Sequence, residues 1–366
     1  ERRVNYEGMF KNIFGNSSEE GRDDSADRQT YAIGDVHGCA HELEILLKKL
    51  SIDRDTKIVF LGDYVDRGAD SRRVIDLILD LSARCEVIPL MGNHEAMFLD
   101  FLERPESMGS GLFILNGGGS TLANYATSGG AFEVPHEHIE FLKNLPIYHQ
   151  TKTHFYVHAG VPLRKKLADL DPIADREVFL WTRGPFLSTD ESWGKIIVHG
   201  HTPNEMPEKK HNRVNCDTGC VFGGALTAYD VTNDAFIAVD RIPLRDQPPI
   251  LHRQYDGKRI AVRFNGRMVV SAGRPGEARQ QFETLNYNQF GLLLRETQLS
   301  ANPFFQVNDF VEGVIGHDYR TAVEFEGQVV RVESRQGLVV FGVKLDKIST
   351  ANDSGHNSNW LKRPAS

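Results

Sequence analysis

One local pattern, repeated five times, constrains the fold of this chain more than any other feature of its sequence. Between Thr30 and Asp240, short apolar runs are followed by glycine and by polar side chains that could bind a metal ion. The runs have the length and the β-branched or aromatic composition of strands. They are residues 31–33, 58–61, 87–91, 155–157 and 196–198. We therefore predict five strands, each ending beside a polar cluster.

Apolar side chains recur at helical spacing after the first and second runs, on one face of each expected helix. The positions are Leu43, Leu46, Leu47 and Leu50, then Val74, Leu77, Ile78 and Leu81. Strands that alternate with helices are typical of a layered α/β domain. Because ligands of such sheets gather at the carboxyl ends of the strands, we expect the polar clusters to meet there.

The polar clusters offer ligands for divalent metal ions. They are Gly34-Asp35-Val36-His37-Gly38, Gly62-Asp63-Tyr64-Val65-Asp66-Arg67-Gly68, Gly92-Asn93-His94-Glu95, His158-Ala159-Gly160 and His199-Gly200-His201-Thr202. Carboxylates, imidazoles and an amide oxygen, without thiols, suit Mn²⁺, Fe or Zn²⁺. Two such ions about 3.5–4 Å apart can clamp a phosphoryl group, which calls for one bridging carboxylate. Each cluster alone is a weak signal, but the ordered set predicts a binuclear centre.

These clusters resemble the PPP family of metallophosphatases, in particular its compact bacterial branch of serine/threonine protein phosphatases. Two further segments contribute to the resemblance: Leu180-Trp181-Thr182-Arg183 and Asp217-Thr218-Gly219-Cys220-Val221-Phe222-Gly223-Gly224. The resemblance covers about residues 30–240 and implies an α/β fold of mixed β-sheets flanked by helices. It also implies hydrolysis of phosphate monoesters by a metal-bound hydroxide, with two divalent ions, Mn²⁺ ahead of Fe or Zn²⁺.

The resemblance further implies a role for each matching position. The implied metal ligands are Asp35 and His37 for the first ion, Asp63 as the bridge, and Asn93, His158 and His201 for the second. His94 would be the general acid, oriented by Asp66. The substrate phosphate would be contacted by Arg67, Arg183 and Asn93, since guanidinium forks suit phosphate oxygens. We interpret His199 as a structural neighbour of the ligands.

The composition of the remaining segments predicts how the chain divides into domains, a linker and tails. Polar residues 1–28 are predicted to be a flexible tail, 29–240 the phosphatase domain, 241–254 a proline-containing linker and 351–366 a second tail. Residues 255–350 alternate strands with turns, which predicts a small all-β barrel. Its expected strands are residues 260–264, 268–271, 291–294, 310–315, 328–332 and 339–345. The glycine-rich stretch 108–130 is expected to be a surface connection, or else a loop or short helix beside the active site.

The predicted barrel resembles a PilZ domain, a receptor for cyclic di-GMP. The resemblance rests on Asn286-Tyr287-Asn288-Gln289-Phe290-Gly291 and on the apolar segments 327–332 and 341–345. Asn288 stands where the messenger-binding motif has serine, and three arginine pairs have the R-x-x-x-R spacing: Arg241/Arg245, Arg259/Arg263 and Arg263/Arg267. Nucleotide binding through Arg241, Arg245, Asn286, Asn288 and Gly291 and a degenerate barrel that docks proteins remain alternatives.

The formal net charge of −8 argues against a nucleic acid polymer or an anionic membrane as the partner. Four cysteines do not make a disulfide scaffold, so we expect a cytoplasmic protein. The C-x₃-C spacing of Cys216 and Cys220 invites a zinc interpretation, but no second pair lies nearby, and packing is the favoured role.

Three functions follow from these observations. The leading one is a phosphoprotein phosphatase whose PilZ-like barrel modulates access for a phosphoprotein substrate, with cyclic di-GMP or a docking protein as the barrel's partner. The alternatives are a hydrolase of dinucleoside polyphosphates, which uses the same metals, and a cyclic di-GMP-responsive regulatory phosphatase. A purely scaffolding phosphatase half is disfavoured, because every ligand position is filled.

Overall fold

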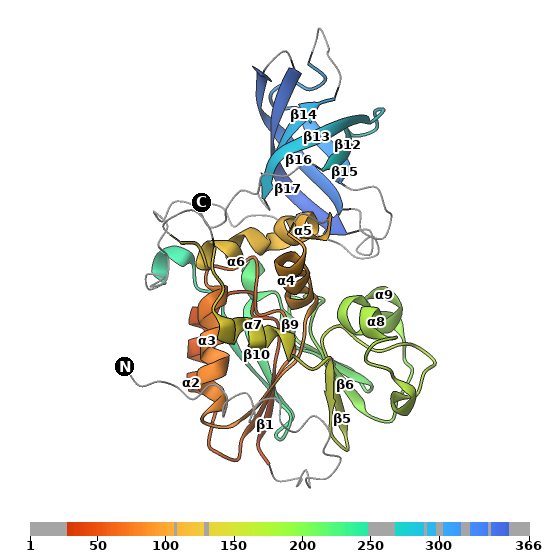
Figure 1. The fold of residues 1–366 in the computed structure, drawn as a ribbon. Helices are drawn as coiled ribbons and strands as arrows, with labels where there is room; N and C mark the ends of the chain where they lie inside the picture. The colour runs from red at the N-terminus through yellow and green to blue at the C-terminus, as the bar shows by residue number, and fades with distance from the viewer. Residues whose placement is uncertain are drawn as a thin grey trace. The chain divides into compact units, whose positions relative to one another are not determined.

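The computed structural model describes residues 28–105, 108–127, 132–247, 268–288, 291–297, 303–315, 323–335 and 338–350. The chain divides into two compact units (Figure 1). The first comprises residues up to Leu99 together with Asn124–Gln254, and the second comprises Asp100–Ala123 and the chain from Tyr255 onward. The predicted tails, apart from Arg28, lie outside the described residues, as do residues 248–254 of the predicted linker and the expected strand 260–264.

Two mixed sheets form the centre of the first unit. The first sheet contains β1 (Thr30–Ile33), β2 (Lys57–Phe60), β3 (Glu86–Pro89), β9 (Asp217–Thr218), β10 (Ala225–Asp230) and β11 (Ala235–Asp240). The second contains β4 (Tyr148–Gln150), β5 (His154–Val157), β6 (Ile196–His199), β7 (Glu208–Lys209) and β8 (Arg213–Asn215). Their orders are β11-β10-β1-β2-β3, with β9 paired to β10, and β4-β5-β6-β8-β7. The five predicted strands are therefore confirmed as β1, β2, β3, β5 and β6.

Parallel pairing aligns the strand ends that carry the polar clusters. Strand β1 pairs in parallel with β2, and β2 with β3, in the first sheet. Strand β5 pairs in parallel with β6 in the second. Apolar side chains of both sheets, among them Val59, Leu61, Tyr156 and Val198, form one buried core cluster. The sheets are thus held to each other by burial of apolar surface, and the polar ends of five strands come to one edge.

Helices flank the sheets, as predicted (Figure 1). The two expected from apolar spacing are α2 (Ala40–Lys49) and α3 (Ser71–Ser82). The side chain of Asp70 caps α3 by accepting the backbone N–H of Arg73 at 3.1 Å. The other helical segments are α4 (Asn93–Glu103), α7 (His136–Lys143), η2 (Leu167–Asp169), α8 (Arg176–Trp181), α9 (Gly184–Ser188), η3 (Cys220–Phe222) and η4 (Leu244–Asp246). The α/β class predicted from the sequence is confirmed.

Residues 241–247, predicted to begin a linker, are anchored to the first unit. The Arg241 guanidinium pairs with the carboxylate of Glu42 in α2, and Glu42 also accepts the backbone N–H of Ile242 at 2.9 Å. The side-chain amide of Gln247 donates to the same oxygen at 3.0 Å. The first unit therefore extends past Asp240.

The second unit contains a closed antiparallel barrel of six strands in the order β12-β13-β14-β17-β16-β15. The strands are β12 (Val269–Gly273), β13 (Gln280–Asn288), β14 (Gly291–Glu296), β15 (Phe310–Ile315), β16 (Val323–Arg335) and β17 (Leu338–Thr350). Phe282, Phe305 and Phe341 are buried and contact one another through their rings. The small all-β barrel is confirmed, although β13 as a strand was not among the expected elements.

The glycine-rich stretch is helical and largely buried, so the expected surface connection is wrong. It contains α5 (Met108–Phe113), η1 (Ile114–Gly118) and α6 (Gly119–Asn124). A Cβ at Gly118 would lie 2.4 Å from the Phe113 ring, so glycine is required for this packing. Within the second unit, η1 contacts β13, and a Cβ at Gly111 would meet the Met268 sulfur at 2.4 Å.

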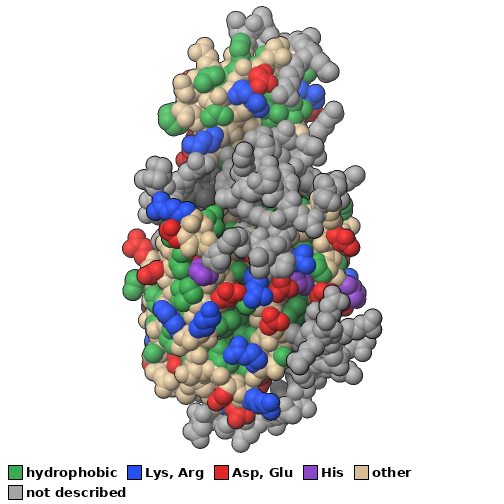
Figure 2. Space-filling view, turned by 90° about the vertical axis from the view of Figure 1, so that its left-hand side faces the viewer, with side chains coloured by type: hydrophobic (Ala, Val, Ile, Leu, Met, Phe, Trp, Pro, Cys, Tyr) green, Lys and Arg blue, Asp and Glu red, His purple; other side chains and the backbone are tan. Residues whose placement is uncertain are grey.

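Two surface properties concern the described residues only. On the face shown in Figure 2, acidic and basic side chains are interspersed rather than separated into large patches of one sign. None of the helices in the described ranges has both the length and the apolar character needed to cross a bilayer.

Candidate metal centre

The polar clusters come together because each follows the carboxyl end of its strand. Asp35 and His37 follow β1, and Asp63 follows β2. Asn93 and His94 begin α4 a few residues after β3. His158 follows β5, and His201 follows β6. All of these side chains are at least 95% buried, with exposed fractions between 0% and 5%.

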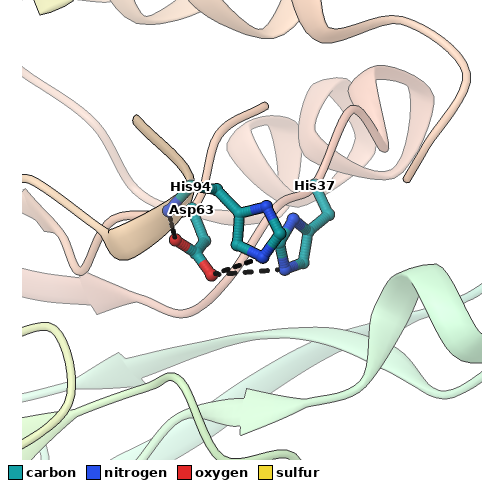
Figure 3. Close-up of side chains that lie close together, drawn as sticks. All are labelled: His37, Asp63 and His94. Carbon is teal, nitrogen blue, oxygen red and sulfur yellow. Dashed lines mark hydrogen bonds and ion pairs between the residues drawn. The ribbon is translucent and has the colours of Figure 1, made fainter. Parts of the chain in front are cut away.

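Asp63 is shared by two groups of possible metal ligands. In each group the ligand atoms all lie within 4.8 Å of one another: His37, Asp63 and His94 in the first, and Asp63, His158 and His201 in the second. Figure 3 shows the first group, with one Asp63 oxygen facing both imidazoles. Oδ2 lies 3.3 Å from His37 Nε2 and 3.9 Å from His94 Nε2, and Oδ1 lies 3.5 Å from His158 Nε2. Asp63 is the residue to which the family resemblance assigns a bridging role, and it is the member that the two groups share.

The second group includes the predicted amide ligand. His158 Nε2 lies 2.8 Å from Asn93 Oδ1 and 3.1 Å from His201 Nδ1. Burial, ahead of other effects, lowers the pKa of His158 to about 4 and that of His201 well below its usual value. These imidazoles are therefore neutral near pH 7, which is the form that binds a metal.

Backbone carbonyls orient two of the imidazoles toward Asp63. His37 Nδ1 donates to the Val65 carbonyl and His158 Nδ1 to the Leu61 carbonyl, each at 2.8 Å. Their Nε2 atoms then carry lone pairs that face a carboxylate, as the ligands of a shared metal ion would. The donor set of imidazole, carboxylate and amide oxygens fits two divalent ions of the borderline or hard class.

The backbone is unusual at these positions. The left-handed φ values are 44° at His37, 55° at Asp63, 73° at Asp66, 66° at Arg67 and 67° at His201. Such conformations are costly for non-glycine residues and persist where the surrounding structure imposes them, often at functional sites. A Cβ at Gly92 would lie 2.2 Å from Asp63 Oδ1, so glycine there makes room for the carboxylate.

Asp35, predicted to bind the first ion, is buried at the same edge but belongs to neither group of ligands. Its two carboxylate oxygens accept the backbone N–H of His201 at 3.0 and 3.2 Å. Burial raises its pKa well above the usual value, and the nearby Asp217 and Asp63 carboxylates raise it further. This concentration of negative charge also favours a bound cation.

His94 has the geometry of a positioned acid or base. Its Nδ1 lies 2.7 Å from Asp66 Oδ2, so the ring is oriented as the sequence predicts. Its ring packs edge-on against that of His37, with 4.6 Å between centroids. Burial, followed by the positive charge of Arg67, lowers the pKa of His94 well below its usual value.

The two predicted phosphate-binding arginines lie at the ligands. Arg67 Nη1 lies 2.8 Å from His37 Nε2, and Arg183 Nε donates to His201 Nε2 at 3.1 Å. Aromatic rings accompany both: the Arg67 guanidinium lies 5.3 Å from the centroid of the Phe222 ring, and the Trp181 ring meets that of His201 edge-on. Two cationic groups therefore converge on the two groups of possible metal ligands.

Two buried carboxylates contribute to the site without having been assigned a role from the sequence. Glu95 in α4 accepts four backbone N–H groups, those of Asp63, Tyr64, Val65 and Gly92, at 2.7–3.1 Å. Asp217 accepts the N–H of Gly219 at 2.9 Å, and burial raises its pKa to about 6. Both stand inside segments that the sequence singles out, but only the fold reveals what they contact.

His199 behaves as a structural neighbour. It is buried against Phe186, and its Nδ1 lies 3.0 Å from the carbonyl of Gly200.

The proposed nucleotide-binding residues fall on different elements. Arg241 lies against Glu42, Arg245 is 80% exposed, and Gly291 packs closely on the β17 backbone. Asn286 and Asn288 lie in β13, and their side chains are outside the described part of the structure, as are Arg259, Arg263 and Arg267.

A layered α/β domain that gathers Asp, Asn and His ligands around a shared carboxylate defines a metallophosphoesterase. Residues 29–234 match the calcineurin-like phosphoesterases, and the chain belongs to that family. A bis(5'-nucleosyl)-tetraphosphatase PrpE [asymmetrical] of Oceanobacillus iheyensis is 32% identical over 57% of this chain and 90% of its own length. The namesake protein of Anoxybacillus flavithermus is 32% identical over 54% of this chain and 87% of its own length. A cold-active protein-tyrosine phosphatase of a Shewanella species has 20% identity and a TM-score of 0.40 over 58% of this chain and 80% of its own.

Proposed function

We propose that the chain hydrolyses dinucleoside polyphosphates, the alternative rather than the leading function expected from the sequence. The observation that carries this proposal is the similarity to proteins named asymmetrical bis(5'-nucleosyl)-tetraphosphatases, which spans about nine tenths of their length. Asymmetrical cleavage of a four-phosphate bridge yields one nucleotide with a single phosphate and one with three. The buried, ligand-rich edge of the first unit is the site of this reaction.

The residues of the site have separate proposed roles. Asp35, His37, Asp63, Asn93, His158 and His201 hold two divalent ions, with Mn²⁺ as the first choice and Fe or Zn²⁺ as alternatives. When bound, such ions neutralise phosphoryl charge and supply a nucleophile at neutral pH. Arg67 and Arg183 would bind phosphate oxygens, and His94 would act as the general acid toward the leaving oxygen, with Asp66 fixing its ring through Nδ1.

A second candidate is the phosphoprotein phosphatase, serine/threonine or dual-specificity, and the His94–Asp66 pair favours it. A serine or threonine alkoxide is a poor leaving group that needs a proton in the transition state. A nucleotide phosphate leaves without one. Asp66 Oδ2 lies 2.7 Å from His94 Nδ1 and orients the imidazole as a proton donor. Such a donor accelerates hydrolysis of an alkyl phosphomonoester more than that of a dinucleotide.

A substrate panel separates the candidates. Full-length protein with Mn²⁺ is assayed separately on diadenosine tetraphosphate, a phosphoserine peptide and a phosphotyrosine peptide. The value of kcat/KM is measured for each substrate. A preference of about tenfold or more for the dinucleotide supports the proposal. The reverse preference would establish the phosphoprotein phosphatase instead.

The barrel of the second unit has a separate proposed role in substrate access. Its PilZ-like pattern makes cyclic di-GMP or a docking protein the candidate partner. Calorimetry with the full chain and cyclic di-GMP distinguishes the two. Saturable binding heat supports the messenger, and the absence of heat at high micromolar messenger leaves protein docking.

A further inference from the structure

A second set of buried ligand atoms lies in the first unit and shares no residue with the Asp63 groups. Cys39, Glu42 and Cys220 each offer one ligand atom, and the three atoms lie within 4.8 Å of one another. The side chains are 0–2% exposed. Cys39 and Glu42 lie at the start of α2, and Cys220 begins η3, so the fold brings together two loops far apart in the sequence.

The two oxygens of the Glu42 carboxylate differ in their hydrogen bonding within the described structure. Its Oε1 accepts from the Arg241 guanidinium, from the Ile242 N–H at 2.9 Å and from the Gln247 amide at 3.0 Å. Its Oε2 is buried and has no hydrogen-bond partner among the residues that the structure describes. A buried carboxylate oxygen without a partner is costly, so this oxygen indicates a cation beside it.

The two thiols stand next to this oxygen, and no disulfide joins them. Cys39 Sγ donates to the His37 carbonyl at 3.6 Å, and the Cys220 and Cys39 thiols are hydrogen-bonded to each other. All four cysteines of the chain are free and buried. With Zn–S bonds of about 2.3 Å and Zn–O bonds of about 2.0–2.2 Å, tetrahedral ligands lie roughly 3.5–3.8 Å apart. The observed 4.8 Å limit admits that spacing.

We propose that Cys39, Glu42 and Cys220 bind one Zn²⁺ ion, distinct from the two ions of the Asp63 centre. Two thiolates and a carboxylate carry three negative charges, which the ion and the Arg241 guanidinium balance. Soft thiolates select Zn²⁺ over Mn²⁺, whereas the oxygen- and imidazole-rich centre accepts either. The bound ion links the β1–α2 loop, which carries His37, to the loop that follows β9.

Cobalt is the probe, because Co²⁺ replaces Zn²⁺ and its thiolate bonds give a near-ultraviolet charge-transfer band. The Asp63 centre contains no thiol, so the band reports the proposed site alone. Reduced, metal-free full-length protein is titrated with Co²⁺. We expect the band to appear, to saturate, and to disappear when Zn²⁺ is added.

Four variants locate the ion. Cys39→Ser and Cys220→Ser should lose the band and retain one Zn²⁺ fewer than wild type by elemental analysis. Glu42→Gln should weaken Co²⁺ binding by about tenfold or more. Cys85→Ser, the matched control at a buried cysteine outside the cluster, should behave as wild type.

Three results would overturn the proposal. The first is a reduced wild-type protein that shows no thiolate band, which needs no variant to fold. The second is a band that survives in Cys220→Ser. The third combines two observations: peptide maps of unreduced protein show a Cys39–Cys220 disulfide, and the reduced protein binds no Co²⁺ through sulfur. The two cysteines would then be a redox pair and not metal ligands.

Discussion

Asp63 connects the two ligand groups through its two carboxylate oxygens, and its own geometry is held by other residues. Its backbone is left-handed, with φ 55°, and its N–H is fixed by Glu95 at 2.9 Å. Oδ1 accepts the N–H of His94 at 3.1 Å. Because the carboxylate cannot rotate without breaking these contacts, its position between the imidazoles is built in before any ion binds.

At the residue scale, His94→Asn separates the candidate reactions. We expect kcat on an alkyl phosphomonoester to fall by about 10²–10⁴-fold, as the loss of a general acid does. The fall on diadenosine tetraphosphate should be smaller, because its leaving group needs no proton. Steady-state kinetics and metal analysis on both substrates measure this. His136→Asn, at an exposed histidine, is the control, and equal losses on both substrates would refute the acid role.

Binding of Mn²⁺ should depend on pH through Asp63. Burial raises the pKa of its carboxyl to about 7, whereas the pKa values of His37, His158 and His201 are lowered. Below pH 7 an ion must displace the Asp63 proton, while the histidines are already neutral. The Asp35 carboxyl, whose pKa burial raises well above its usual value, adds a second proton to be displaced. We expect the apparent Kd for Mn²⁺ to rise about tenfold or more per pH unit below about pH 7. Calorimetric titration tests this, and a Kd unchanged down to about pH 5 would contradict it.

Most of the candidate site could be predicted from single residues. The ligands stand just after apolar runs, so strand prediction places Asp63, His158 and His201 at strand ends. Only the fold shows that β2 of the first sheet meets β5 and β6 of the second at those ends. Nothing in the sequence indicates that Glu42 faces Cys39 and Cys220, because that contact depends on how α2 packs beside η3. The role of Glu95 was missed for the same reason, since it depends on four backbone groups rather than on a motif.

At the scale of elements, α4 positions the loop that follows β2. Glu95, fully buried, accepts four N–H groups from that loop and from Gly92, so it joins the two segments that carry Asp63 and Asn93. The loop has few other ways to satisfy these groups, because it curves through left-handed residues instead of pairing as a strand.

Glu95→Gln should therefore lower the free energy of unfolding by about 2–4 kcal/mol, because a neutral amide cannot replace a carboxylate acceptor for four buried donors. Metal affinity should fall as well, since Asp63 loses its support. Chemical denaturation measures the first effect and Mn²⁺ titration the second. Glu133→Gln, at an exposed position, is the matched control. An unchanged denaturation midpoint would show that the loop does not depend on Glu95.

Sequence patterns predicted the strands of the first unit better than the helices of the second. Short continuous apolar runs that end at glycines mark β1 and β2. The glycines at 117–119 predict a loop, but helical segments lie on both sides of a kink at Gly117, whose φ is 112°, and the missing Cβ of Gly118 leaves room for the Phe113 ring. Strand β13 went unrecognised in Gln280–Asn288, where polar residues are frequent and a register shift at Thr284/Asn286 interrupts the alternation.

At the scale of the whole molecule, every assigned ligand lies in the first unit. A chain ending at Gln247 should thus keep kcat/KM on an aryl phosphate within about tenfold of full length. Its melting temperature should fall, because β13 no longer covers η1. A chain ending at Asp240 is the matched comparison and should melt lower still, since it also lacks Arg241, Ile242 and Gln247 against Glu42. Loss of aryl activity in a folded, metal-loaded 1–247 chain would show that the barrel completes the site.

The most direct test of the account is product analysis with diadenosine tetraphosphate, Mn²⁺ and the full chain, beside its Asp63→Asn variant. We predict that wild type forms AMP and ATP in equal amounts. The variant, which lacks the shared carboxylate, should be at least about 10³-fold slower, and the exposed Asp169→Asn control should match wild type. Wild-type protein that leaves the dinucleotide intact while it dephosphorylates a phosphoserine peptide would contradict the proposed substrate, and an active Asp63→Asn variant would contradict the metal centre itself.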